Sequence, residues 1–367
     1  MSLGFLNRFF SRFFPTPSFL AESSFGLDIS DESLKFLELV NTRDGIKVGR
    51  RGQFDLPPGV MESGKIKDSK KMQEILAKLR ADEGITSVRV SLPEEQVYLF
   101  QLRLEKLGLV NVRESIELAL EEHVPLPATE AIFDYEFLDQ DEESIRLQVA
   151  TIPQNVIENY LNIFKNANID VQSFELEAQA IARAVVKKGD QDTYMMVDFG
   201  ERTTGISIIS REIVMFTSTL DVGGSMLNDS ISKSFKISPA EAEKMKKQYG
   251  LQRNAPNKEL FSVLLNSVSV LRDEIVKHFL YWHTHKDEEG KNNPPIKKII
   301  LCGGDSNLIG LPEYFSISMK NPVEMANVWV NIMDTKEYIP DIDFKHAISF
   351  AAALGLALRD FETINLD

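Results

Sequence analysis

The stretch MMVDFGERTTG at residues 195–205 decides the fold, and a shorter relative of it, FGLDIS, occurs at residues 25–30. In each, an apolar β-prone run delivers an aspartate, Asp198 or Asp28, into a turn of small or polar residues, and a second β-prone run follows. Backbone N–H groups at such a turn form a nest for anions, and an aspartate at its base can hold a hydrated magnesium ion. Two copies about 170 residues apart predict an internally duplicated protein with a cleft that grips one nucleotide from two sides.

A third element, IILCGGDSNLIGLP at residues 299–312, is an apolar strand that runs into a Gly-Gly turn and then a helix start. Gly303 and Gly304 would let the backbone lie close against a flat base, and Asp305 or Ser306 is expected to cap the following helix. Each motif alone is more often plain loop chemistry. Their order and spacing favour a nucleotide cleft.

Taken in order, these motifs resemble the nucleotide-cleft motifs of the actin, FtsA and DnaK-type ATPase superfamily, and most closely those of the PilM family of type IV pilus assembly proteins. Residues 26–39 match the first phosphate loop, residues 198–208 the second, and residues 301–311 the adenosine loop. Residues 174–184 and 350–359 are similar to the two connecting helices, whose small residues let helices cross closely.

Two further stretches single out PilM within the superfamily. Residues 118–127, LALEEHVPLP, followed by FDYEF at 133–137, resemble the inserted subdomain of that family. Residues 223–231 and 237–246 resemble its stretch from a Gly-Gly turn to the helix beside the ribose. The resemblance spans residues 22–360.

The resemblance implies an α/β, actin-like ATPase fold of the duplicated ribonuclease H type, with a small inserted α/β subdomain in the first half, as in FtsA. We expect an amphipathic leader over residues 1–21. The first half would cover residues 22–190, with the inserted subdomain at about 97–170, and the second half residues 191–367, with the adenosine loop.

The same resemblance implies ATP and Mg²⁺ as ligands, with Asp28 and Asp198 holding the metal through water. Expected around the phosphates are Ser30, Ser33, Gly200, Thr203 and Thr204. Expected beside the ribose and adenine are Gly224, Glu243, Lys246, Gly303, Gly304, Asp305 and Asn307. Glu243 and Lys246 have an alternative reading as a solvated salt-bridge pair on a helix.

Glu177 matches the position where chaperone-type relatives place a carboxylate near the attacking water. With Asp198 it is the candidate catalytic group, and we expect at most a slow ATPase.

Two departures from the family pattern bear on nucleotide binding. The usual Gly-Ser/Thr-Ser run of the first loop is Ser30-Asp31-Glu32 here, and the usual third glycine of the adenosine loop is Asp305. If Asp31 and Glu32 turn outward, the backbone amides still serve the phosphate. If they turn inward, each disfavours phosphate by ~1 kcal/mol or more at an effective dielectric of about 20.

Bulk properties exclude several classes of protein. A chain of 367 residues is long enough for two halves with separate cores. A net charge of −14 argues against a nucleic-acid binder, which needs a basic face. One cysteine rules out an intrachain disulfide, and with five scattered histidines it also argues against a zinc site. No run approaches the ~20 apolar residues of a membrane span.

The N-terminus offers one membrane contact. Large apolar residues recur there at helical spacing with polar residues opposite: Phe5, Leu6, Phe9, Phe10, Phe13 and Phe14. Arginines interrupt the run, which argues against a signal peptide. A helix over residues 5–14 would lie on an anionic membrane, dock on a partner or pack on its own domain, and a disordered leader is the remaining alternative.

Elsewhere the pattern predicts alternating strands and helices. Strands are expected within residues 25–56, 88–104, 132–137 and 145–152, with residues 139–143 at a hairpin tip. Helices are expected at 68–80, with Asp68 as the cap, and at 112–123, 154–167, 238–249 and 257–285.

Three functions follow from the resemblance. The first is an ATP-binding scaffold at the cytoplasmic face of the inner membrane, in type IV pilus assembly or a related type II secretion system. It would bind the N-terminal cytoplasmic tail of a single-span PilN-like membrane protein through the inserted subdomain, with apolar pockets from residues 132–137 and 147–152 and an acidic stretch at 114–122. Contacts with pilus motor ATPases and self-association are left open.

The second is an FtsA-like, membrane-tethered, filament-forming cell-division protein. FtsA-like proteins carry their amphipathic anchor at the C-terminus, whereas residues 360–367 are polar here. The third is a sugar or acetate kinase on the same fold, which lacks an identifiable second substrate site; fold alone does not fix function.

Overall fold

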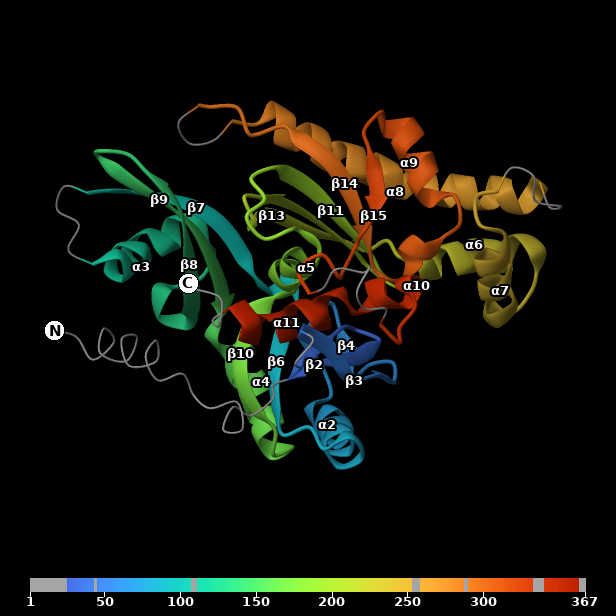
Figure 1. Cartoon of the computed structure of the whole chain (residues 1–367), viewed down its shortest axis with the longest axis horizontal. Coiled ribbons are helices and arrows are strands. Elements are labelled where there is room, and N and C mark those ends of the chain that lie inside the picture. Colours follow the sequence, from blue (N-terminus) through green and yellow to red (C-terminus); the bar gives the residue numbers. More distant parts are fainter. Residues whose placement is uncertain are drawn as a thin grey trace.

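The computed structural model describes residues 25–42, 45–106, 111–252, 258–286, 290–332 and 340–362. These residues form two five-stranded mixed sheets, a smaller three-stranded sheet, and helices that pack between and outside them (Figure 1). The predicted leader over residues 1–21, with its aromatic segment at 5–14, lies outside the described residues.

The first sheet has the strand order β10-β6-β1-β2-β3. Its strands are β1 (Phe25–Ile29), β2 (Ser33–Thr42), β3 (Gly45–Asp55), β6 (Ser87–Leu92) and β10 (Asp170–Leu176). The first three strands form an antiparallel meander, and β6 lies parallel to β1 and to β10.

The second sheet has the order β13-β12-β11-β14-β15. Its strands are β11 (Thr193–Phe199), β12 (Thr204–Ser210), β13 (Ile213–Leu220), β14 (Ile296–Cys302) and β15 (Val323–Met325). Again three strands form an antiparallel meander, and the last two run parallel to the first. The repeated topology confirms the internal duplication predicted from the two aspartate motifs.

Strand alternation decides where the two aspartates point. In β1, Phe25 and Leu27 are buried against the outer helices α2 (Ser69–Glu83) and α4 (Gln154–Asn166). In β11, Met195 and Val197 are buried with the long helix α8 (Lys258–Thr284). Asp28 and Asp198 therefore lie on the opposite faces, which look toward each other between the sheets.

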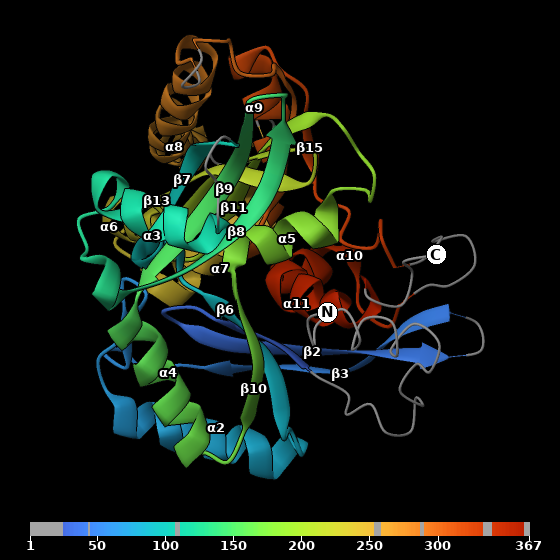
Figure 2. The ribbon, with the colours of Figure 1, turned by 90° about the vertical axis from the view of Figure 1, so that its left-hand side faces the viewer.

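Two helices pack between the sheets: α5 (Glu177–Val185) and α11 (Ala351–Glu362) (Figures 1 and 2). They cross without room for a side chain, because a Cβ atom at Gly355 would lie 1.7 Å from the carbonyl oxygen of Ala180. The helix predicted over residues 174–184 begins later than expected. Residues 174–176 are the end of β10, where pairing with β6 takes precedence over the local helical pattern.

The remaining helices of the second half cover the outer face of its sheet or the cleft edge. They are α6 (Gly224–Phe235), α7 (Pro239–Tyr249), α9 (Leu311–Met319) and the short α10 (Phe344–Ala347). Ser238 caps α7 in a capping box with Glu241. In the first half Asp68 caps α2 as predicted, by accepting from the N–H of Lys71.

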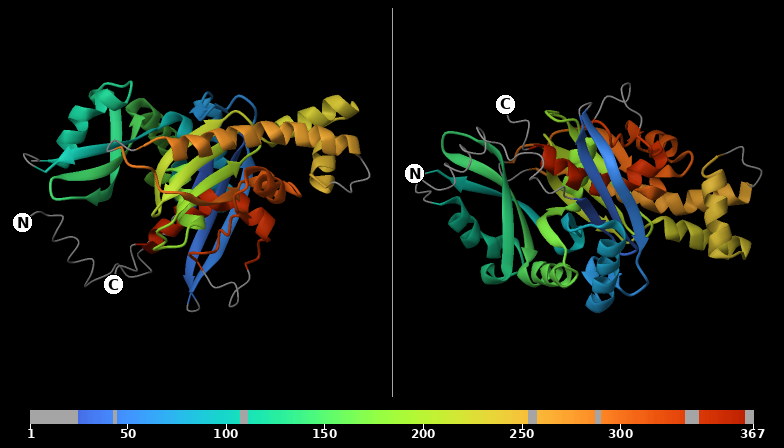
Figure 3. Two further views of the ribbon diagram at one scale, coloured as in Figure 1. Left: turned by 90° about the horizontal axis from the view of Figure 1, so that it is seen from above. Right: turned by 60° about the horizontal axis from the view of Figure 1, so that its bottom comes forward.

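The three-stranded sheet lies at one end of the molecule, opposite to α6 and α7 (Figure 3). Its order is β7-β9-β8, with β7 (Tyr98–Glu105), β8 (Ala131–Gln140) and β9 (Ser144–Pro153), and α3 (Val112–His123) packs on one face. This unit falls within the interval 97–170 given to the inserted subdomain; the exact domain boundaries remain predictions.

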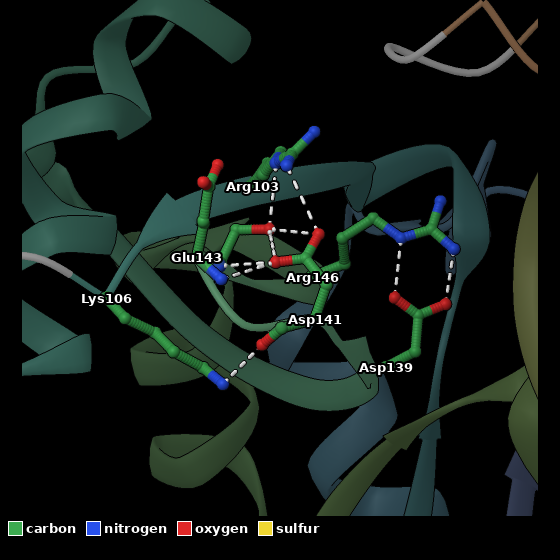
Figure 4. A network of polar contacts seen from close by, with 7 residues as sticks. Arg103, Lys106, Asp139, Asp141, Glu143 and Arg146 are labelled. Atoms are coloured by element: carbon green, nitrogen blue, oxygen red, sulfur yellow. Dashed lines mark hydrogen bonds and ion pairs between the residues drawn. The ribbon is translucent and has the colours of Figure 1, made fainter.

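Charged groups close the β8–β9 hairpin (Figure 4). The Asp141 carboxylate accepts from the N–H groups of Glu143 and Ser144. The ammonium of Lys106 donates to the main-chain carbonyl oxygen of Asp141. Arg146 pairs with Asp139 beside it. Local hydrogen bonds of this kind stabilise the turn that the sequence predicted at residues 139–143.

Among the residues that the structure describes, no helix has the length and apolar character needed to cross a membrane.

Candidate functional site

A cavity of about 870 Å³ opens between the two halves, where the ends of β1 and β11 face each other. The first half contributes Asp28, Ser30, Asp31, Glu32, Ser33, Lys35, Glu94, Glu95 and Glu177 to its lining. The second half contributes Asp198, Gly200, Glu201, Arg202, Thr203, Glu243, Lys246, Gly303, Gly304, Asp305 and Asn307, among others. The cavity therefore brings together most of the residues that the sequence assigned to a nucleotide.

The turn between β1 and β2, residues 30–33, forms one wall. The N–H of Ser30 donates to the carbonyl of Ser33 at 3.0 Å, which closes the turn. Asp31 does not approach a phosphate position freely, because its carboxylate accepts from the N–H groups of Ser63 and Gly64 at 2.8 and 3.1 Å. Those two residues join the short strands β4 (Met61–Glu62) and β5 (Lys65–Ile66).

The turn between β11 and β12, residues 200–203, forms the opposite wall. It is closed by a 3.0 Å bond from the N–H of Gly200 to the carbonyl of Thr203. Within the described ranges, the N–H groups of Glu201, Arg202 and Thr203 donate to no protein acceptor. Three neighbouring N–H groups without a protein acceptor are what an anion-binding nest requires.

Carboxylates gather at the floor of the cavity. Asp28 is buried and accepts from the hydroxyl of Ser91 at 2.9 Å. Burial raises its pKa, and Lys35 partly opposes that rise. Loss of hydration raises the pKa of Asp198 to about 6, with Lys35 again opposing and the charge of Asp28 adding. The floor thus holds two carboxyls whose ionised forms lack enough positive charge nearby.

Glu177, the first residue of α5, lies beside them in the cavity lining. Its pKa is raised well above the ordinary value, first by desolvation and then by the charges of Asp28 and Asp198. A carboxyl that is readily protonated and faces a cleft is suited to proton transfer with water held there.

One buried cation, Lys246, lies at the part of the cavity lined by Glu243 and Asp305. Lys246 is 3% exposed, and its ammonium lies 2.6 Å from Asp305 and 3.1 Å from Glu243. Partial burial opposes ionisation of Glu243, yet hydrogen bonds from Lys247, Lys246 and Asn228 lower its pKa to about 2. Burial raises the pKa of Asp305, placed where the family has glycine, and the ion pair with Lys246 partly opposes that rise. Glu243 and Lys246 do form the salt bridge of the alternative reading, but the ammonium is enclosed rather than solvated.

Gly303 holds the adenosine loop against the second turn. It has φ of +84°, and a Cβ atom there would lie 2.4 Å from the Asp198 carboxylate. The amide of Asn307 donates to the carbonyls of Gly304 and Lys345, which ties this loop to α10. The predicted helix cap is wrong: α9 begins at Leu311, its N-cap residue Gly310 has no side chain to cap it, and the hydroxyl of Ser306 donates instead to the carbonyl of Cys302.

Two predicted lining residues do not face the cavity. Thr204 is fully buried, and its hydroxyl donates to the carbonyl of Val222 at 2.5 Å. Strand alternation turns it to the face of β12 away from Asp198. Gly224 lies behind Asp305, since a Cβ atom there would meet that carboxylate at 2.1 to 2.2 Å. Both assignments to direct ligand contact are corrected; Gly224 instead leaves room for Asp305.

Sequence reasoning missed Lys35 and Glu94. Lys35 pairs directly with Asp28 on the β1–β2 ladder, so the register of the predicted hairpin contained the signal. Glu94 follows β6, whose carboxyl end meets that of β1 at the same sheet edge. It accepts from the N–H of Ala178 at 2.8 Å and from the hydroxyl of Thr217, which joins the two halves at the floor of the cavity. Desolvation raises its pKa to about 7 against these two hydrogen bonds.

Within the described ranges, no three His, Cys, Asp or Glu side chains converge closely enough to bind a metal directly. Asp28 and Asp198 both line the cavity, and a metal held by them through water stays a prediction.

A second cavity, of about 800 Å³, lies where the three-stranded unit meets the first half. Its lining includes Gly64, Lys65, Gln96, Leu126, Thr129, Glu130, Gln154, Asn155, Asn159 and Tyr160. The hydroxyl of Tyr160 is buried and has no hydrogen-bond partner within the described ranges. By contrast, Leu147 and Val149, expected in apolar docking pockets, are buried in the core because β9 is the central strand under α3.

Solved structures with the same arrangement cover nearly the whole chain. A structure of the PilM-PilN type IV pilus biogenesis complex matches with a TM-score of 0.75 and 20% identity, over 92% of this chain and 98% of that one. MreB5 of Spiroplasma citri bound to ADP matches with a TM-score of 0.56 and 15% identity, over 94% and 97%. At these identities the likeness establishes an actin-like ATPase fold.

In sequence, the cell division protein FtsA of Streptococcus pneumoniae is 27% identical over 177 residues, 44% of this chain. The match spans only 38% of the length of that FtsA. The model of the family described as type IV pilus assembly protein PilM matches residues 26–361. The chain therefore belongs to the PilM family of type IV pilus assembly proteins.

Proposed function

We propose that this protein is an ATP-binding scaffold of type IV pilus assembly that binds the cytoplasmic N-terminal tail of a PilN-like membrane protein. One observation carries the nucleotide part. Two hairpin turns of the same topology face each other across one cavity, with an aspartate at the base of each and an adenosine-type glycine loop beside them.

The residues present suit a magnesium nucleotide. Carboxylates outnumber cationic side chains in the cavity lining, so a bare polyphosphate would be repelled, whereas a divalent cation neutralises both partners. Asp28 and Asp198 would hold the hydrated metal, and the amides of residues 201–203 together with Lys35 would hold the phosphates. Gly304 is exposed in the cavity lining, and its backbone, which carries no side chain, would let a flat base approach closely.

Turnover is expected to be slow. Glu177 would accept a proton from water, but burial raises the pKa of Glu177, and the protonated carboxyl that this favours cannot act as a base. A scaffold depends on ATP that stays bound in the cleft and does not require rapid ATP hydrolysis. Release of many phosphates per second that vanished in Glu177→Gln would contradict the scaffold and favour an enzyme.

The nucleotide claim is tested by thermal unfolding with Mg²⁺ and ATP. A ligand of the native state raises the melting temperature by mass action. We expect a shift that grows with ATP from micromolar to millimolar concentrations and needs Mg²⁺. A melting temperature indifferent to millimolar Mg-ATP would remove nucleotide binding from the proposal.

For the tail peptide we propose the second cavity. The amide side chains of Gln96, Gln154, Asn155 and Asn159 line it, and amides can both donate to and accept from an extended peptide backbone. The buried hydroxyl of Tyr160 lacks an acceptor that a peptide carbonyl would supply. The outer face of β8 is the competing surface, where Tyr135 and Phe137 are 39% and 51% exposed.

Anisotropy of a fluorescent peptide with the tail sequence of the organism's own PilN-like protein separates these surfaces. Asn155→Arg places a long side chain in the cavity and should weaken binding at least tenfold. Leu118→Arg, on the exposed side of α3, and Phe137→Arg, on β8, should leave affinity within twofold. Tyr160→Phe should weaken binding about fivefold with no loss of stability. Loss in Phe137→Arg alone would move the site to β8.

The proposed location is the cytoplasmic face of the inner membrane, reached through the tail peptide. Residues 5–14 offer direct lipid contact as the alternative. A variant lacking residues 1–20 should keep peptide binding and membrane recruitment in cells that contain the partner; loss of recruitment would favour lipid anchoring.

A further inference from the structure

An ion pair spans the mouth of the nucleotide cavity from one turn to the other. Arg202, in the second turn, donates from Nε to the Oε1 atom of Glu32, in the first turn, 170 residues away. The side chains are 46% and 23% exposed, and both line the cavity. A ligand that enters between the turns meets this pair.

Arg202 has unused hydrogen-bonding capacity. A guanidinium carries five N–H donors, and among the described residues only the Nε group of Arg202 has an acceptor. Its two Nη groups are therefore available to an acceptor inside the cavity. Paired N–H groups of arginine match the oxygens of a phosphate.

Two other cations of the cavity lining pair with carboxylates outside the two turns. Lys246 is enclosed by Asp305 and Glu243, and Lys247 lies 2.8 Å from Glu243. Arg202 differs, because its ion pair joins the two turns and Arg202 itself is 46% exposed, and ion pairs with an exposed member contribute little free energy. It is the cation of the two turns that can change partner at small cost.

Glu32 has a second carboxylate oxygen and a neighbouring carboxyl that bear on the loss of Arg202. Its Oε2 atom is buried and accepts no hydrogen bond from the described residues. The neighbouring carboxyl of Glu201 lies within reach, and its contact with Glu32 is the main cause that raises the pKa of Glu201 to about 7. Once the arginine leaves, the unbalanced charge of Glu32 raises the pKa of Glu201 further.

We propose that Arg202 exchanges Glu32 for the polyphosphate of an entering nucleotide, so that Arg202 is a phosphate-binding residue and Glu32 its competitor. This inference rests on the proposed nucleotide binding. One N–H···O ion pair breaks, new N–H···O bonds form to phosphate oxygens, and the Glu201 carboxylate becomes more fully protonated by taking up a proton from solvent.

Isothermal titration with Mg-ATP at pH 7.5 tests the exchange, because the two partners should act in opposite directions. Glu32→Gln should tighten binding about fivefold to tenfold, since the competitor is gone. Arg202→Gln should weaken it about tenfold, the effect of one charge-assisted phosphate contact. The exposed pair Asp192 and Lys297, outside the cavity lining, supplies matched controls, and Asp192→Asn and Lys297→Gln should change affinity less than twofold.

A pair that only ties the halves together would give another pattern, in which both substitutions change affinity in the same direction or not at all. That result overturns the exchange while leaving nucleotide binding intact. No binding by the unmodified protein would overturn both.

Proton uptake gives an independent readout. Titrations in two buffers of different ionisation enthalpy should show protons taken up when the unmodified protein binds Mg-ATP, and uptake near zero in Glu32→Gln. Equal uptake in the two proteins contradicts the exchange. Without nucleotide, Glu32→Gln and Arg202→Gln should melt within about 2 °C of the unmodified protein, as expected for a half-exposed pair.

Discussion

The two hairpins that face each other across the cleft are built alike but charged differently. Opposite Asp28 on the β1–β2 ladder lies Lys35, whereas opposite Asp198 on the β11–β12 ladder lies Gly205. The first turn carries the carboxylates of Asp31 and Glu32, which accept hydrogen bonds from other groups; the second carries N–H groups that have no protein acceptor among the described residues. Both hairpins keep the aspartate. The first adds a lysine that compensates its charge, and the second adds backbone N–H groups suited to an anion.

The strands beneath the turns differ in the same way. Position 26 of β1 is glycine, while the corresponding position of β11 is Met196, which lies in the central core. Helix α11 packs so closely on β1 that a Cβ atom at Gly26 would lie 1.8 Å from the carbonyl oxygen of Ala353. The first half is thus fixed to the helix between the sheets at a point where the second half has space for a large side chain.

The largest effect we predict is therefore for Gly26→Ala. The clash is with helix backbone, which cannot move without shifting α11, so the free energy of unfolding should fall by about 3 kcal/mol or more. Met196→Ala, the matched change in the second half, should instead leave a cavity and lower the free energy of unfolding by about 2–4 kcal/mol. Urea unfolding measures both, and a neutral Gly26→Ala would contradict the packing of α11 on β1.

Next in size is the pH dependence of the ligand-free protein. The pKa values of Asp198 and Glu94 are raised to about 6 and about 7, so the native state binds protons more tightly than the unfolded chain. Stability should fall as the pH rises from 5 to 8, by about 2 kcal/mol after allowance for solvent screening. Glu243 does not offset this, because its pKa of about 2 lies below the window.

Urea unfolding at several pH values measures this profile. Asp198→Asn should flatten it, since the amide has no proton to lose. If the ligand-free protein instead gained stability steadily between pH 5 and 8, the claim that burial raises the pKa values of the carboxyls at the cleft floor would be contradicted.

Glu94 should show a smaller effect that sharpens the comparison between halves. Glu94→Gln weakens the carboxylate's bonds to the N–H of Ala178 and the hydroxyl of Thr217, and should lower stability by about 1–2 kcal/mol. Thr217→Val should cost a similar amount, and the double variant should cost less than the sum. Glu95→Gln, the same change at the next residue, is the matched control for Glu94→Gln. Strict additivity of the two changes would show that the contact between halves is not formed.

The smallest predicted effect is at Asp31. Asp31→Asn keeps an oxygen for the N–H groups of Ser63 and Gly64 but removes a charge from the cavity lining. Stability should change by less than about 1 kcal/mol, and Mg-ATP affinity should rise about twofold to fivefold. Weaker nucleotide binding in Asp31→Asn would mean that the carboxylate contributes to the site directly.

Local pattern explains what the sequence predicted well. The strand, aspartate and turn of each hairpin, the cap at Asp68 and the bounds of α3 follow from alternation, turn chemistry and capping within a few residues. The destination of Asp31 could not be predicted, because its partners lie more than 30 residues away. The buried pairing of Lys246 with Asp305 likewise needs contacts 59 residues apart.

One measurement tests the central claim most directly: calorimetric titration of Mg-ATP into the unmodified protein and into Asp198→Asn at pH 7.5. If the cleft between the two turns is the nucleotide site, the unmodified protein binds one ATP, and Asp198→Asn binds it at least tenfold more weakly while remaining folded. Equal affinity in the two proteins, or no binding by the unmodified protein, would contradict the account.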